Sequence, residues 1–159
     1  MSIEKAKNYL AQFGVENKIQ EFDTSSATVE LAAKALNCAP SRIAKSLSFM
    51  IAGKPTIVVI AGDVKVSNSK FKQQFQTKAK MLSFEEVESL IGHKVGGVCP
   101  FGINDGVDVF LDISLKQYQT VFPACGSSNS AIELTIAELE KFSAYKAWVD
   151  IGQETILTQ

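Results

Sequence analysis

The sequence contains little of the chemistry that metal sites and many enzymes need. Its 159 residues include one histidine, His93, and three cysteines without a C-x-x-C pair. A zinc site needs about three or four nitrogen, sulfur or oxygen ligands close together, and a disulfide framework needs an even set of cysteines. The sequence therefore favours neither, and it predicts reduced thiols at Cys38, Cys99 and Cys125.

Histidine-based catalysis would depend on His93 alone. This residue follows a helix stop at Gly92 and stands beside Lys94, which favours a surface position over a catalytic one. A catalytic thiol at Cys99 would have no basic partner that the sequence reveals. Neither G-x-x-x-x-G-K-[ST] nor G-x-G-x-x-G occurs, so the common phosphate loops are also missing.

Long apolar runs and an excess of positive charge are missing as well. No apolar stretch approaches about 18 residues, and the N-terminal segment is charged, so we expect no membrane span, no secretory signal and a cytoplasmic protein. The net charge of −1 disfavours a general DNA- or RNA-binding protein. Residues 63–80 nevertheless contain five lysines and one acid, which indicates either a solvated face or a phosphate-facing patch.

What the chain does contain predicts one α+β domain over residues 1–159. Its length and its 46% of hydrophobic residues suffice for a buried core. Strand and helix patterns alternate without a strict β-α-β rhythm, which favours a mixed sheet. We expect helices over residues 3–13, 28–37, 67–76, 83–92 and 135–142. We expect strands over residues 18–22, 44–52, 56–61, 107–112, 120–124, 131–134 and 145–151.

Lys45 fits this pattern least well. In the strand predicted over residues 44–52 it shares the more apolar face with Leu47 and Phe49, while Ser46 and Ser48 lie on the other face. Burying an ammonium group is costly unless it is paired or faces a polar pocket. A lysine can also lay its stem over apolar surface and keep its charge at the rim. Both interpretations of Lys45 stay open on composition alone.

A second unusual feature is the stretch GGVCPFG, from Gly96 to Gly102. Gly96 and Gly97 permit a close backbone approach or a positive φ, and Pro100 stiffens the far side of the turn. Such a segment can direct several backbone N–H groups toward one small polar centre, as an oxyanion or phosphate site requires.

Five stretches taken in order resemble the YbaK-type aminoacyl-tRNA deacylases, relatives of the editing domain inserted in bacterial prolyl-tRNA synthetases. They are RIAKSLSF, IAGDVKVSNSKF, VGGVCPFG, VFLDISL and VFPACGSSNSAIELTIAEL, and the resemblance covers roughly residues 2–150. It implies a barrel-like mixed sheet surrounded by helices. It also implies hydrolysis of the ester that joins a small, wrong amino acid to the acceptor end of a tRNA, chiefly proline tRNA, without a metal or other cofactor.

The resemblance implies roles for individual residues. Lys45 matches the active-site lysine of the family, and it would hold the terminal phosphate or ribose and stabilise developing negative charge. The expected substrate-binding residues are Ser46, Asp63, Gly96, Gly97, Val98, Cys99, Pro100 and Gly126. The expected tRNA-binding residues are Lys65, Lys70 and Lys72. Many relatives have serine in place of Cys99 and paired glycines in place of Cys125-Gly126, and both differences bear on the size of the pocket.

Three other interpretations remain. The first is a module of the same fold that binds tRNA or a synthetase without hydrolysing anything. The second is an enzyme in which Lys45 forms a Schiff base in a desolvated pocket. The third is a structural protein in which Lys45 only lays its stem over apolar surface. Because the chain is close to neutral, prolyl-tRNA synthetase is an expected partner that would supply tRNA affinity, whereas DNA is not expected.

Overall fold

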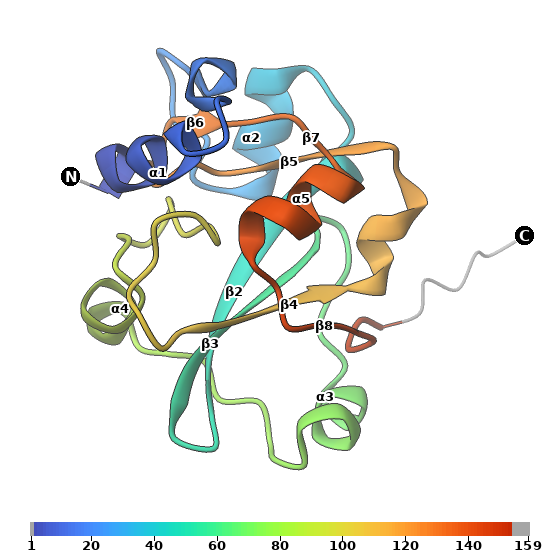
Figure 1. Ribbon diagram of the computed structural model, residues 1–159. Coiled ribbons are helices and arrows are strands. Elements are labelled where there is room, and N and C mark those ends of the chain that lie inside the picture. The colour runs from blue at the N-terminus through green and yellow to red at the C-terminus, as the bar shows by residue number, and fades with distance from the viewer. Residues whose placement is uncertain (1, 154–159) are drawn as a thin grey trace, which may run out of the picture.

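The computed structural model describes residues 2–153, and the single domain expected over residues 1–159 extends past them at both ends. Six strands form the main sheet, in the order β7-β5-β2-β3-β4-β8. In chain order these strands are β2 (Ile43–Ile51), β3 (Lys54–Ala61), β4 (Asp108–Asp112), β5 (Thr120–Pro123), β7 (Leu134–Thr135) and β8 (Ala147–Val149). Parallel and antiparallel pairs are both present, and the sheet curls into a half-barrel (Figure 1). The α+β fold with a mixed sheet is therefore confirmed.

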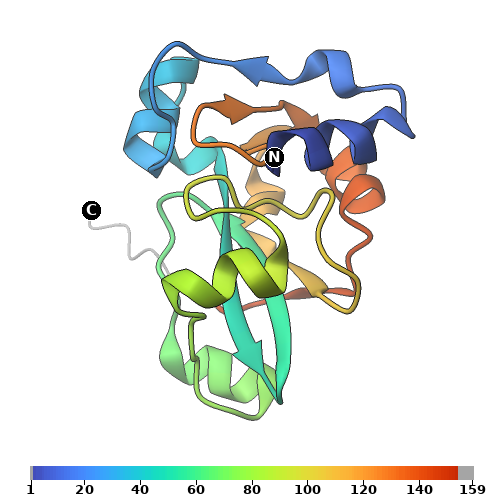
Figure 2. The ribbon, with the colours of Figure 1, turned by 90° about the vertical axis from the view of Figure 1, so that its left-hand side faces the viewer.

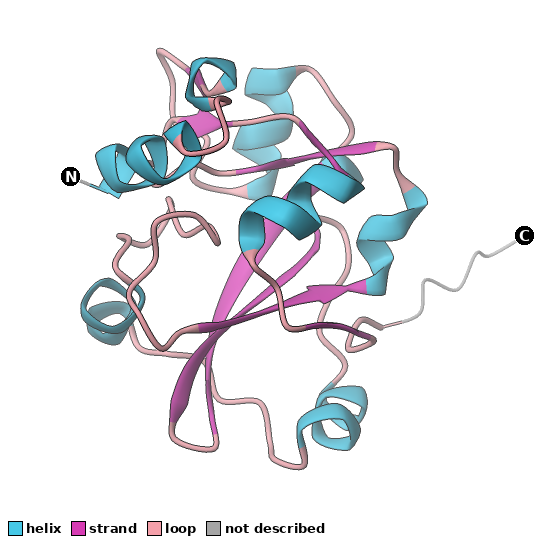
Figure 3. Ribbon diagram, in the orientation of Figure 1, coloured by secondary structure: helices cyan, strands magenta, loops and turns pink. Residues whose placement is uncertain are grey.

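Five α-helices surround the sheet (Figure 3). They are α1 (Ser2–Ala11), α2 (Val29–Leu36), α3 (Asn68–Phe75), α4 (Phe84–Glu86) and α5 (Ile136–Ser143), and a π-helix over Val87–Ile91 continues α4. Both sequence-predicted capping boxes form, because the Ser83 and Thr135 hydroxyls accept from the N–H groups of Glu86 and Glu138. The helices predicted from the sequence are thus all present.

Aromatic side chains hold the helices in place. On α3, Phe71 packs against Phe49 of β2 with 4.8 Å between ring centroids. Phe13, just after α1, packs against Phe142 of α5 at 4.6 Å. Figures 1 and 2 show α2 at one end of the molecule, where β2 begins, and α3 at the opposite end. The turn of α4 and the loop that follows it lie between these ends.

The expected hairpin of β2 and β3 forms the centre of the sheet, but the other edge of β2 is only partly covered. The two strands pair antiparallel from Ala44 to Ile51. On its other edge, β2 pairs with β5 only at Ile43 and Ala44. The segment around Met81 joins this edge farther along, where Leu82 N–H donates to the Ser48 carbonyl. Among residues 2–153, β2 has no strand partner on this edge between these two contacts, so the sheet opens at Lys45–Leu47.

One strand expectation needs correction. The strand expected over residues 131–134 is divided into β6 (Ser130–Ala131) and β7, which have different partners. β6 pairs antiparallel with β1 (Gln20–Glu21), and β7 pairs with β5. The pairing of β1 with β6 joins segments far apart in the sequence, and no local pattern marks it.

Candidate functional site

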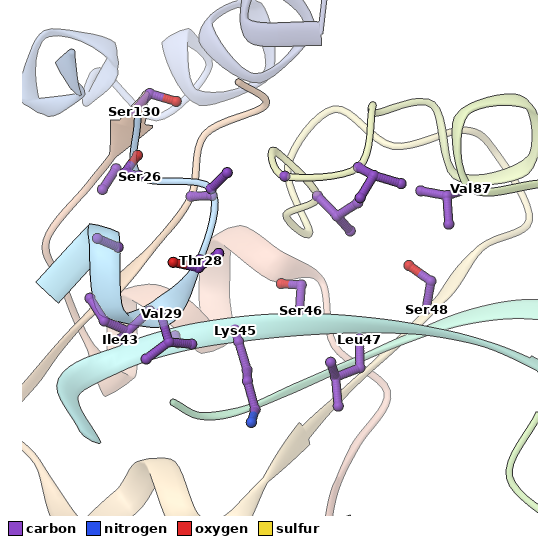
Figure 4. Close-up of a pocket in the computed structure, with 18 of the residues that line it drawn as sticks. Ser26, Thr28, Val29, Ile43, Lys45, Ser46, Leu47, Ser48, Val87 and Ser130 are labelled. Atoms are coloured by element: carbon purple, nitrogen blue, oxygen red, sulfur yellow. The ribbon is translucent and has the colours of Figure 1, made fainter. Parts of the chain in front are cut away.

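A cavity of about 300 Å³ lies at the open edge of β2. Its walls come from β2, the start of α2, the segment before α4 and the loop after the π-helix, as Figure 4 shows in close-up. Most lining side chains are small or apolar, and five carry hydroxyl groups: Ser26, Thr28, Ser46, Ser48 and Ser130. The cavity therefore fits a small organic group whose polar atoms need hydrogen bonds.

Ser46 is the most informative residue of this cavity. Its hydroxyl is buried, and in the described part of the chain it has no hydrogen-bond partner. The Ser48 carbonyl and the Met50 N–H both bond to the segment around Met81. Because backbone groups of alternate residues point to the same edge of a strand, the N–H and carbonyl of Ser46 point to the open edge as well. Ser46 thus directs three polar groups toward the cavity, and a buried hydroxyl without a partner favours a bound ligand.

Lys45 lines the same cavity, but its ammonium lies on another side of the strand. Figure 4 shows Lys45 and Leu47 leaving β2 on the side opposite to Ser46 and Ser48, as strand alternation predicts. The Lys45 Nζ donates to the Gly62 carbonyl at 3.3 Å. This is the rim position of a lysine that lays its stem over apolar surface. Lys45 thus lines the cavity, while its ammonium group forms its hydrogen bond at the rim.

The charge on Lys45 is partly desolvated. Burial lowers the pKa of its ammonium, and the nearby carboxylates of Asp63 and Glu30 oppose that change. Lys65 also lies close enough to lower the Lys45 pKa. The half-buried ammonium group of Lys45 can therefore attract a phosphate or a developing negative charge.

The glycine-rich loop forms a further wall of the cavity. The Gly97 N–H donates to the Lys94 carbonyl at 3.0 Å, and Gly96 takes a φ of 95°. A turn with positive φ at its third position needs glycine there. Gly96 and Val98 line the cavity. Cys99 and Pro100 are buried, and neither they nor Gly97 line it.

His93 corrects one expectation. It is fully buried rather than at the surface, and its Nε2 donates to the Phe101 carbonyl at 2.6 Å. The Cys99 Sγ lies 3.5 Å from the same nitrogen, so Cys99 does have a histidine neighbour. Burial raises the pKa of the Cys99 thiol to about 12 and lowers the pKa of His93. The pair therefore stays neutral near pH 7 and braces the base of the loop.

The other predicted site residues lie outside the main cavity. Gly126 lines a neighbouring groove together with Gly97. Asp63 and Lys70 line a third depression, and Lys70 pairs with Asp150 at 3.2 Å. Lys72 is exposed on α3, at the end of the molecule away from α2. Of the expected tRNA-binding lysines, Lys65 is thus the one that lies near Lys45.

Sequence reasoning missed several residues of the cavity. Ser26 belongs to a loop that carries no motif, and its N–H donates to the Ser128 carbonyl at 2.6 Å. Phe84 occupies the first turn of a helix whose cap was recognised, yet its exposed side chain lines the cavity. Both come together with β2 only through tertiary contacts, so no spacing in the sequence indicates them.

The described residues form neither a metal-binding cluster nor a membrane-spanning helix. No three His, Cys, Asp or Glu side chains within residues 2–153 gather closely enough to hold a metal ion. None of the helices described is long and apolar enough to cross a membrane.

Comparison with known proteins gives consistent results. Residues 23–142 match the sequence profile of the aminoacyl-tRNA editing domain. An uncharacterised protein of Bacillus subtilis (strain 168), YwhH, is 53% identical over 155 residues, which span 97% of this chain and 99% of YwhH. A proline–tRNA ligase of Bacillus cytotoxicus is 27% identical over 117 residues, or 73% of this chain, but the match spans only 20% of the ligase.

The fold is also similar to solved structures. A crystal structure described as a proposed trans-editing enzyme for prolyl tRNA synthetase superposes with a TM-score of 0.86 and 25% sequence identity. The superposition covers 96% of this chain and 98% of that one. The half-barrel sheet and the surrounding helices are therefore shared over nearly the whole length of both chains.

Proposed function

The chain belongs to the aminoacyl-tRNA editing domain family, and from this premise we propose that it hydrolyses the ester of a mischarged tRNA in trans. The observation that carries the proposal is the cavity itself. Lys45, Ser46 and Gly96, which stand far apart in the sequence, line one space of about 300 Å³. A non-catalytic binding module would not need an unpartnered hydroxyl and a half-buried cation at the same cavity.

The reaction is a simple hydrolysis. The oxygen of a water molecule attacks the ester carbonyl carbon, the bond to the ribose oxygen breaks, and that oxygen leaves as a hydroxyl after gaining a proton. The amino acid departs as a free carboxylate, and the second proton of the water passes to solvent. An aminoacyl ester is already activated, so positioning and stabilisation of the developing oxyanion can supply most of the catalysis. No step requires a histidine or a metal ion.

Ser46 and the loop are proposed to hold the ester. Ser46 offers its hydroxyl, its backbone N–H and its carbonyl to the cavity, which suits an α-amino group and the carbonyl of the ester. Gly96 and Val98 are the loop residues proposed to contact the ester and the water. Gly97, Cys99, Pro100 and Gly126 are proposed to hold the shape of the loop from behind.

Lys45 is proposed to bind the terminal phosphate or ribose. An ammonium group has three donors, and among the described residues its one hydrogen bond goes to Gly62. Because the ammonium lies on the side of β2 opposite to Ser46, the phosphate or ribose is proposed to meet it beside the cavity rather than within it. The attraction of the nearby Asp63 carboxylate supports the charged form of Lys45. Asp63 is thus proposed to act through Lys45, from outside the cavity.

The substrate is proposed to be proline tRNA that carries a small wrong amino acid. The likeness to proline–tRNA ligases and to a proposed trans-editing enzyme supports this choice. Lys65, Lys70 and Lys72 are proposed to steer the acceptor stem, with Lys65 nearest to Lys45. The near-neutral net charge of −1 favours prolyl-tRNA synthetase as a partner that adds tRNA affinity, and a tRNA substrate places the activity in the cytoplasm.

The test is a panel of aminoacylated tRNAs. Proline tRNA charged with alanine, cysteine, serine or threonine is incubated with the protein, with and without prolyl-tRNA synthetase, and the remaining ester is measured over time. Correctly charged prolyl-tRNA serves as the control. We expect faster loss of at least one mischarged ester than in buffer. Intact esters throughout, with the synthetase present, would leave the non-catalytic binding module as the better account.

A further inference from the structure

Three exposed apolar side chains line the mouth of the cavity. Phe84 has 77% of its surface exposed, Met81 57% and Val95 43%. All three line the cavity that Lys45 and Ser46 share. Burying such a side chain would stabilise the fold by roughly 1.5–3 kcal/mol, so folding alone gives no reason to leave three together at the surface.

The mouth is a rigid structure. Met81 is held to β2 because Leu82 N–H donates to the Ser48 carbonyl at 3.0 Å and Met50 N–H donates to the Lys80 carbonyl at 2.8 Å. Phe84 occupies the first turn of α4, where the capping box fixes the backbone, with Ser83 N–H donating to the Glu86 carboxylate at 2.8 Å. An exposed aromatic ring on a fixed backbone is a suitable surface for stacking a planar group.

We infer that Phe84, with Met81 and Val95, forms a stacking platform for the terminal base of the RNA whose ester enters the cavity. The inference rests on the proposed function. The ester is carried by the ribose of the last nucleotide, so the base of that nucleotide must lie within one nucleoside length of the reacting carbon. The platform borders the same cavity, and unpaired bases in protein complexes stack on aromatic side chains.

Two lysines and three glutamates surround the platform. Exposed Lys80 and Lys94 directly precede Met81 and Val95, so cations flank two of its three segments. Glu85, next to Phe84, and exposed Glu88, one turn farther along, carry opposing charges, while the Glu86 carboxylate is engaged by the helix cap. Phosphates that follow the terminal base would meet the two lysines.

The test removes the terminal base of the RNA and the aromatic ring of Phe84, separately and together. Binding of a short fluorescent RNA ending in CCA is compared with binding of the same RNA whose last nucleotide is abasic. Both are titrated with the unmodified protein, Phe84→Ala, Phe84→Trp and Ile113→Ala. Ile113 is a matched control, because it is 43% exposed but does not line the cavity.

We expect the unmodified protein and Phe84→Trp to bind the CCA end tighter than the abasic end, by about 5-fold to about 150-fold. Phe84→Ala should bind both RNAs alike, and Ile113→Ala should behave as the unmodified protein does. Equal preference for the CCA end in Phe84→Ala and the unmodified protein would overturn the inference. Loss of synthetase binding in Phe84→Ala, with RNA binding unchanged, would overturn it too and assign the platform to a protein partner.

This assay needs no hydrolysis, so its failure is distinct from failure of the proposed function. If mischarged tRNAs are hydrolysed while Phe84→Ala keeps its preference for the base, only the platform is wrong. If the preference depends on Phe84 but no ester is hydrolysed, the platform stands and the hydrolase is wrong.

Discussion

The backbone of Gly97 packs directly on the backbone of Gly126. A Cβ atom at position 97 would lie 2.6 Å from the carbonyl carbon of Gly126 and 2.6 Å from the nitrogen of Ser127. Real Cβ atoms do not approach backbone atoms this closely, so one of the two turns would have to move. The two glycine turns that the sequence singled out are thus one structural unit behind the cavity wall.

Gly97→Ala should therefore impair the site more than the fold. Overpacking of this kind costs about 1–3 kcal/mol, and the displaced Gly96 and Val98 would no longer line the cavity correctly. We expect the rate of ester hydrolysis to fall by about 100-fold or more, measured beside the free energy of unfolding in urea.

Gly106→Ala is the matched control for this prediction. Gly106 has a φ of 88° and open space around it, so alanine there costs backbone strain of about 1–2 kcal/mol without any clash. Its stability should fall to a similar extent while hydrolysis continues. Equal activity of the two variants would show that the packing of Gly97 on Gly126 does not shape the site.

Cys99 is predicted to be dispensable as a nucleophile. Burial raises the pKa of its thiol to about 12, so almost no thiolate exists near pH 7. Cys99→Ser should keep hydrolysis within about 3-fold of the unmodified rate. Iodoacetamide should label the half-exposed Cys38 in the folded protein, and Cys99 and Cys125 only after unfolding, as peptide mass spectrometry can measure. Rapid labelling of Cys99 together with loss of activity would instead favour a catalytic thiol.

His93 is predicted to make stability depend on pH. Burial lowers the pKa of its imidazole below the ordinary value of about 6.5. The unfolded chain then binds more protons than the folded chain between these two pKa values. Stability is therefore full above about pH 6.5 and is lost as the pH falls through the lowered pKa, with a slope of at most about 1.4 kcal/mol per pH unit.

The change of stability with pH can be assigned to His93 because the chain has one histidine. Urea unfolding between pH 7.5 and pH 5 should show falling stability for the unmodified protein and a nearly flat profile for His93→Gln. Carboxylates with lowered pKa values, such as Asp108, act at lower pH. Identical profiles for both proteins would mean that His93 is not protonated on unfolding in this range.

Local patterns predicted much of the fold. The alternation of Lys45 with Ser46, the hairpin of β2 and β3, and both capping boxes depend on neighbouring residues, and all of them form. The burial of His93 was not predictable, because it depends on the return of the chain to Phe101 after the glycine turns. The open edge of β2 depends on where β5 departs and Met81 arrives, which no local spacing reveals.

The sequence indicated some residues of the candidate site but not how they are arranged around the cavity. The sequence pointed to Lys45 and the glycine-rich loop because a lysine on an apolar face and paired glycines are unusual. Nothing in the residue types indicated that Gly96 and Val98 would line the cavity while Cys99 lies buried behind them. That distinction depends on how the loop packs on the rest of the fold, including the contact of Gly97 with Gly126, which residue types do not encode.

The central claim is tested most directly by the hydrolysis of mischarged proline tRNA by the unmodified protein and by Lys45→Ala, with protein in excess over tRNA. Lys141→Ala, an exposed lysine on α5 that does not line the cavity, is the control. We predict release of at least one small amino acid by the unmodified protein and by Lys141→Ala, and a rate about 100-fold lower for Lys45→Ala at unchanged melting temperature. Equal rates for Lys45→Ala and the unmodified protein, or no release by any of them, would contradict the account.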